Sequence, residues 1–268
     1  LPAAMTTIST APSLQSNDHR DSDLQALIRE SLAHPAIRHP FLTRFAQCDF
    51  PNMVSVLRQY ALEYSGYSAW FPRYLTTVIS RLSQAEHREK LEHNLEEEQG
   101  HLGEDDCQAL LAQGINPASV AGVPHPVLFR RFCDALGIHR EELGTPSPAA
   151  SRWRTRFLNY LQNATAAEAV GALGLGTEHI VRPVYEQLLK GIIGMGTLRR
   201  DEFVFFELHC LVDDQHQQDL LEIARDLAAA PNGIAELRRG MQTALAMRCE
   251  FWDHLYNEIL NKQMVNPA

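Results

Sequence analysis

Apolar residues recur at spacings of three and four from Asp23 onward, which is the period of an α-helix, and no segment shows the strict alternation of a β-strand. The pattern predicts helices over residues 22–34, 51–82, 83–103 or beyond, 150–190, 199–229 and 231–262. Pro72 should kink or divide the second helix, because a proline in a helix interior removes a backbone hydrogen bond. Five prolines between Gly114 and Pro148 indicate a connector with one short helix near residues 126–136. The predicted fold class is therefore all-α, a single domain of about seven to nine helices.

The first part of the chain differs from the rest. Residues 1–20 are rich in Ser, Thr, Asn and Asp and show no periodicity, so we expect a disordered tail before a helical domain of residues 21–268. Residues 1–4 precede Met5 and are interpreted as a cloning remnant.

Composition narrows the class of function. The net charge of -9, with no cluster of Lys and Arg beyond short pairs, argues against a nucleic-acid partner. Because the chain has neither a run of about 18 apolar residues nor a basic-then-apolar leader, we expect a soluble, cytoplasmic protein without a membrane partner. Five cysteines without a CxxC pair indicate neither a disulfide framework nor a thiolate zinc site.

The sharpest candidate site is the spacing His209-x-x-x-Asp213-x-x-His216. On a helix, offsets of four and seven residues lie within about 40° of the first residue, so these three side chains share one face. The apolar run from Phe203 to Phe206 indicates that this face points inward. The alternative is a polar helix face with surface histidines.

Two glutamates stand alone in apolar stretches. Glu63 is the only Asp, Glu, Lys or Arg in QYALEYSGYSAWFP, and Glu178 is the only one in AVGALGLGTEHIV. Burying an unpaired carboxylate is costly, so each must meet a cation, take up a proton or bind a metal. An arginine from another helix for Glu63, and Arg182 for Glu178, are the alternative partners.

The segment NLEEEQGH offers a further pair. Glu97 and His101 are four residues apart, and Glu98 and His101 have the Glu-x-x-His spacing that recurs in di-iron helix bundles. The sequence leaves open whether Glu97 or Glu98 is the ligand. Consecutive glutamates on a solvated face are the alternative.

Taken together, these residues suffice for two metal ions. The predicted ligands are Glu63, Glu97, His101, Glu178, His209, Asp213 and His216. Four carboxylates balance two divalent ions, whereas one zinc ion needs only about four ligands. Oxygen and nitrogen donors without thiolate favour iron or manganese. Four aromatic residues are candidates for the substrate lining, although plain core packing is the alternative: Tyr60, Tyr67, Trp70 and Phe206.

Over about residues 51–221 the sequence resembles the heme-oxygenase-like di-iron oxidases, relatives of the coenzyme PQQ synthesis protein and of thiaminase-type folds. That family carries a glutamate on an early core helix, an Asn-x-x-Glu-Glu-x-Gly segment, a glutamate after a Gly/Ala-rich stretch, and His-x-x-x-Asp-x-x-His. In this chain the similar positions are Glu63, residues 94–100, Glu178 and residues 209–216.

The resemblance implies a heme-oxygenase-like helical bundle that holds two Fe(II) ions and takes O2 as co-substrate. It further implies N-oxygenation or oxidative C–C cleavage of a small carboxylate- or amine-bearing metabolite, amino-acid-derived or a fatty acid, in natural-product biosynthesis. The identity of the substrate, an external electron donor and a homodimer stay open.

The chain departs from the family at one position. Many members place a histidine several residues after the glycine that Gly100 matches, and here that region reads Asp105-Asp106-Cys107. The resemblance suggests His101 as the replacement ligand, as in the family's alkene-forming fatty-acid decarboxylase, with a weakly held second iron. The alternatives are a metal-independent enzyme on the same scaffold and a non-catalytic interaction protein.

Overall fold

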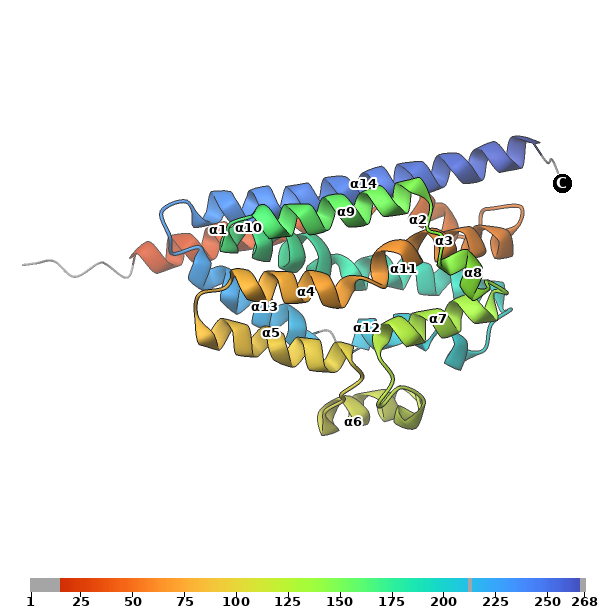
Figure 1. The fold of residues 1–268 in the computed structure, drawn as a ribbon, viewed down its shortest axis with the longest axis horizontal. Coiled ribbons are helices and arrows are strands. Elements are labelled where there is room, and N and C mark those ends of the chain that lie inside the picture. Colours follow the sequence, from red (N-terminus) through yellow and green to blue (C-terminus); the bar gives the residue numbers. More distant parts are fainter. Residues whose placement is uncertain (1–14, 212–213, 266–268) are drawn as a thin grey trace, which may run out of the picture.

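A computed structural model describes residues 15–211 and 214–265, which form an all-helical bundle (Figure 1). No strand occurs among these residues, so the predicted all-α single domain is confirmed. The helices are α1 Gln15–Ala33, α2 Pro40–Ala46, α3 Met53–Ser68, α4 Phe71–Arg81, α5 Ala85–Glu98, α6 Glu104–Ala112, η1 Pro117–Ser119, α7 His125–Ala135, α8 Arg140–Leu143, α9 Pro148–Asn163, α10 Ala166–Val170, η2 Gly171–Glu178, α11 His179–Met195, η3 Arg200–Glu202, α12 Val204–Leu211, α13 Asp214–Leu227 and α14 Gly233–Val265. None of them is long and apolar enough to cross a membrane.

The first helix begins earlier than predicted, and the division at Pro72 falls where it was predicted. Helix α1 begins at Gln15, so part of the predicted tail is helical, while residues 1–14 lie outside the described residues. The prediction for Pro72 is confirmed, because α3 ends at Ser68 and α4 begins at Phe71 with the proline in its first turn. A proline is tolerated there because the first turn has unpaired N–H groups in any case.

The predicted helix over residues 150–190 is divided after Asn163. Thr165 caps the next helix, since its hydroxyl accepts a hydrogen bond from the Glu168 N–H at 3.2 Å. The Glu168 carboxylate in turn accepts one from the Thr165 N–H at 2.9 Å. This reciprocal capping box starts α10 and overrides the helical period that continues across it.

Segment η2 is a π-helix that packs closely on the long helix α14. A Cβ atom on Gly171 would come within 2.1 Å of the Leu237 carbonyl oxygen, and one on Gly176 within 2.8 Å of the Met241 carbonyl oxygen. Only glycine therefore permits this approach at the two positions. Glu178 is the last residue of η2, so the close packing fixes where its carboxylate lies.

The connection from α5 to α7 begins earlier than predicted, since the sequence predicted a helix that continues to residue 103 or beyond. Helix α5 ends at Glu98, not near Gly103, because Gly100 adopts a positive φ of 96°. The Gly122 N–H donates a hydrogen bond to the Gly100 carbonyl oxygen at 2.8 Å, so the connector folds back onto the end of α5. In Figure 1, α6 projects from the bundle on the side opposite α14, and the chain then returns to begin α7 at His125.

The predicted helix over residues 199–229 is described as two segments, α12 and α13. Asp213 lies outside the described residues, so its predicted role as a ligand stays a prediction. His209 belongs to α12 and His216 to α13.

Candidate metal centre

Three buried side chains from three helices meet beside the end of α5. They are Glu98 of α5, His125 of α7 and His209 of α12, with 4%, 5% and 8% of their surface exposed. One ligand atom from each lies within 4.8 Å of the others. Carboxylate and imidazole groups at this spacing, away from solvent, have the chemistry of a metal site.

His209 presents one ring nitrogen to this cluster. Its Nδ1 atom lies 2.6 Å from the Phe205 carbonyl oxygen. Since a carbonyl only accepts, Nδ1 carries the proton and the lone pair of Nε2 is left for a metal. Burial, and then proximity to His125, lowers the pKa of His209 to about 3. The imidazole is therefore neutral at neutral pH, which is the form that binds metals.

The two carboxylates of the cavity have opposite shifts. Burial by itself would raise the pKa of Glu98, but the neighbouring His125 outweighs it and holds that pKa at about 2. Burial raises the pKa of Glu178 to about 7 against the opposing effect of His216, and the charge of Glu98 adds to the increase. Between about pH 2 and 7 Glu98 is therefore ionised and Glu178 protonated, and a cation bound beside both would favour the ionised form of Glu178 as well.

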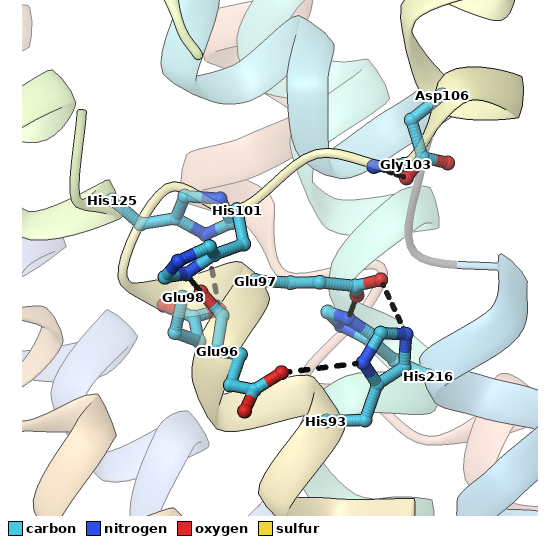
Figure 2. A network of polar contacts seen from close by, with 9 residues as sticks. All are labelled: His93, Glu96, Glu97, Glu98, His101, Gly103, Asp106, His125 and His216. Atoms are coloured by element: carbon cyan, nitrogen blue, oxygen red, sulfur yellow. Dashed lines mark hydrogen bonds and ion pairs between the residues drawn. The ribbon is translucent and has the colours of Figure 1, made fainter. Parts of the chain in front are cut away.

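Glu97 points to a different set of partners. Adjacent residues on a helix are about 100° apart, so Glu97 and Glu98 face different neighbours. The Glu97 carboxylate contacts Nε2 of His216 from α13 and lies 3.3 Å from Nε2 of His93, as Figure 2 shows. Glu97 and His216 are also buried. Both glutamates left open by the sequence are thus placed against histidines, and Glu98 is the one that lines the cavity.

His101 is not part of this cluster. It is exposed in the loop after α5, and its Nδ1 atom lies 2.9 Å from the Glu96 carbonyl oxygen (Figure 2). The Glu-x-x-His spacing assumed a continuous helix, whereas the positive φ of Gly100 ends α5 before His101. The prediction that His101 shares a helix face with Glu98 is wrong for this reason.

Glu63 is buried but its partners are elsewhere. Its carboxylate accepts hydrogen bonds from the Gln59 side chain at 3.2 Å and from the Ser147 hydroxyl. Ser147 is the N-cap of α9, where unpaired backbone N–H groups favour a negative charge. The structure therefore satisfies Glu63 without a metal, and among the described residues Glu63 belongs neither to the cluster of Glu98, His125 and His209 nor to the lining of the cavity.

The cluster borders a small cavity of about 30 Å³, enough for one or two water-sized species. Its lining includes Tyr64, Tyr67, Ser68, Phe71, Glu98, His125, Phe129, Thr177, Glu178, Val181, Tyr185, Phe205 and His209. Glu178 and His209 line it as expected of ligands. The Tyr64 and Tyr185 hydroxyls are hydrogen bonded to each other at 2.9 Å and supply polar groups in an otherwise apolar wall.

The four aromatic residues predicted to line a substrate site lie in different places. Tyr67 borders the cavity. Among the described residues, the other three pack elsewhere. Tyr60 stacks on Trp252 in the core, Phe206 packs edge-on against Phe132, and Trp70 lies between two arginine guanidinium groups. For Tyr60 and Phe206 the helical spacing reflects core packing, which was the alternative interpretation.

His125 was missed by sequence reasoning. It lies in the sequence PHP at the start of the short helix predicted in the connector. A lone histidine between two prolines has no spacing to another ligand, so only the folding of the connector onto α5 could reveal it.

The residues present fit a bound metal. Nδ1 of His125 is buried and lies 3.0 Å from a Glu98 oxygen without making a hydrogen bond. This ion pair without hydrogen-bond geometry, together with the raised pKa of Glu178, fits a donor set of imidazole and carboxylate groups for a cation. Fold and site thus define a helical bundle with a candidate metal centre of carboxylate and imidazole groups.

Comparison with known proteins shows the family of this chain. Residues 58–249 match the family described as iron-containing redox enzyme, and the chain belongs to this family. A 4-aminobenzoate synthase of Chlamydia muridarum is 25% identical over 187 residues, which cover 68% of this chain and 69% of that protein. A CADD-like protein of unknown function from Nostoc punctiforme has a TM-score of 0.69 at 16% identity, covering 91% of this chain and 99% of that one.

A domain of unknown function with a heme-oxygenase-like fold from Shewanella denitrificans has a TM-score of 0.65 at 14% identity, covering 97% of each chain. The predicted heme-oxygenase-like fold and the resemblance to its iron-containing members are therefore confirmed.

Proposed function

We propose that this iron-containing redox enzyme holds two ferrous ions and uses dioxygen to oxidise a small carboxylate- or amine-bearing metabolite. The observation that carries the proposal is the pair of buried ligand sets at the end of α5. Glu98 faces His125, His209 and the cavity, while Glu97 faces His216. Glu178 lines the same cavity and supplies a further carboxylate.

The residues of the chain have separate roles in this proposal. When bound, ferrous iron would supply the electrons and the open coordination positions at which dioxygen is reduced. The Phe205 carbonyl orients the imidazole of His209 so that Nε2 faces the cavity. Phe71, Phe129 and Phe205 form an apolar wall that limits access of water.

Features of the cavity favour a small amphiphilic substrate. Aromatic rings surround a few polar groups, among them the paired hydroxyls of Tyr64 and Tyr185 and the side chain of Thr177. The chemistry of this lining suits a ligand with an apolar body and one or two polar ends, and the cavity of about 30 Å³ must widen to admit it. The name of the Chlamydia relative refers to a compound with both an amine and a carboxylate, which belongs to the proposed class. We place the reaction in natural-product biosynthesis, with an external electron donor where the substrate supplies too few electrons.

Anaerobic reconstitution with ferrous iron tests the proposal. The full chain should bind about two equivalents and then consume dioxygen when substrate candidates of the proposed class are added. Binding of one equivalent or fewer with intact activity would contradict the di-iron assignment. Activity that survives exhaustive chelation would instead favour a metal-independent enzyme on this scaffold.

A further inference from the structure

We propose that His125 is a metal ligand of this chain and replaces the histidine that is missing after Gly100, an inference that rests on the proposed metal centre. The connector between α6 and α7 would thus contribute to the site as well as cover it. None of the spacings that mark the other candidate ligands includes His125.

The position of His125 is that of a ligand. Metal bonds of about 2.0–2.2 Å place two ligand atoms on one ion about 3–4.4 Å apart. Nδ1 of His125 lies 3.0 Å from Oε1 of Glu98, and the ring centroids of His125 and His209 are 4.7 Å apart. These side chains can therefore reach one ion with small rotations.

The Nδ1 atom of His125 is buried and poorly paired. His125 is 5% exposed, and its Nδ1 atom makes no hydrogen bond in the described structure. Buried polar groups in native proteins are nearly always well paired, whereas this Nδ1 atom lies 3.0 Å from the Glu98 carboxylate in an ion pair without hydrogen-bond geometry. A shared cation would satisfy Nδ1 and the Glu98 carboxylate at once.

The backbone is built to hold His125 there. A Cβ atom on Gly100 would lie 2.5 Å from the Val123 nitrogen, so only glycine lets the connector approach the end of α5. The hydrogen bond from the Gly122 N–H to the Gly100 oxygen fixes this contact. Pro124 and Pro126 then start α7 with His125 between them, directed toward Glu98 (Figure 2).

His101 provides a matched comparison. It is close to Glu98 in sequence and matches the Glu-x-x-His spacing, yet it is exposed and bound to a backbone carbonyl. His125 is distant in sequence and buried against Glu98. Substitution of His125 should therefore weaken metal binding, whereas substitution of His101 should not.

Titration of the metal-free full chain with Co(II) under anaerobic conditions is the test, because Co(II) reports its ligands through its visible absorption. His125→Ala should weaken binding at one site about tenfold or more and change the spectrum, whereas His101→Ala should leave both unchanged. Circular dichroism verifies the fold, and His125→Gln provides a variant of similar volume. Imidazole added to His125→Gly should restore the spectrum.

The outcomes separate this inference from the proposed function. If the His125 variants bind Co(II) like the parent while His209→Ala loses it, the metal centre stands and the inference about His125 fails. If His101→Ala causes the loss instead, the inference fails as well. If the parent binds neither Co(II) nor Fe(II), the proposed function and the inference fail together.

Discussion

Neighbouring residues on one helix divide the site between two sets of histidines. Glu97 contacts His216, and Glu98 lies beside His125 and His209. A one-residue step turns a side chain by about 100° around a helix, so the two carboxylates face different buried partners where α7, α12 and α13 converge on the end of α5. The site therefore depends on single side chains whose neighbours are close in space and distant in sequence.

His209→Ala should abolish iron-dependent oxygen consumption and preserve the helical fold. The substitution removes an imidazole whose tautomer is fixed by the Phe205 carbonyl, and it also removes that hydrogen bond, worth about 1 kcal/mol. Iron content, oxygen uptake and far-ultraviolet circular dichroism are the measurements. His139→Ala, at an exposed position that does not line the cavity, is the control. A His209→Ala protein that consumes oxygen like the parent would show that the residue is structural.

Glu178 should make the metal-free protein lose stability as the pH rises from about 5 to 7 relative to a variant with a glutamine at this position, while the lowered pKa of His209 has the opposite effect on both proteins. In this interval the folded state keeps the Glu178 proton, because the pKa is raised from 4.5 to about 7, while the unfolded state has released it. Since Glu178 binds more protons in the folded state, its contribution to the free energy of unfolding falls with increasing pH, by at most about 3 kcal/mol. Urea denaturation at several pH values measures this.

Glu178→Gln provides the control for that measurement, since an amide does not ionise. The decline should be largely absent in the variant, and bound metal should reduce it in the parent. A parent whose stability is constant or rises over this interval, in parallel with the variant, would contradict the account of Glu178.

At the scale of elements, the junction between α5 and α7 determines where His125 lies relative to Glu98. Gly100 and Gly122 both have positive φ, of 96° and 74°. A Cβ atom on Gly100 would meet the Val123 backbone, whereas one on Gly122 would meet nothing within 4 Å. The two positions therefore separate the backbone strain from the contact that positions α7.

Gly100→Ala should destabilise the protein by about 1–3 kcal/mol more than Gly122→Ala and should weaken metal binding. Both variants force a side chain into a positive φ, and only the first also pushes the connector away from α5. Urea denaturation and Co(II) titration of the two variants are the measurements. Equal effects on stability and no change in metal affinity would mean that the contact does not position His125.

Iron should order the segment after α5. Residues 94–111 include the end of α5, the glycines Gly100 and Gly103, and the start of α6. Their amide protons should exchange more slowly in the iron-loaded protein than in the metal-free protein, because ligand binding by Glu98 ties this segment to α12. Helix α1, none of whose residues lines the cavity, serves as the internal reference. Equal exchange in both states would contradict the expected coupling.

Much of the molecule as a whole could be predicted from the sequence. Helical periodicity and proline positions predicted the all-helical domain and the break before α4. Isolation in an apolar stretch marked Glu178, which lines the cavity, but the same pattern marked Glu63, which α9 satisfies. Periodicity reports that a residue is buried and does not report what it is buried against.

The rest of the candidate metal centre could not be predicted from the sequence, because the positions of its residues depend on tertiary contacts. His101 was favoured by its spacing, yet the conformation of Gly100 ends the helix that this spacing assumed. His125 reaches Glu98 only because the connector docks on Gly100. Asp213 lies outside the described residues, so its place in the site stays a prediction.

The central claim is that the buried carboxylates and imidazoles at the end of α5 hold two iron ions. Anomalous diffraction at the iron absorption edge, from crystals of protein loaded with ferrous iron anaerobically, tests it most directly. The account predicts two anomalous peaks about 3.5–4 Å apart, within bonding distance of Glu98, Glu178, His209 and His216. A single peak, or iron bound away from these residues, would contradict the account.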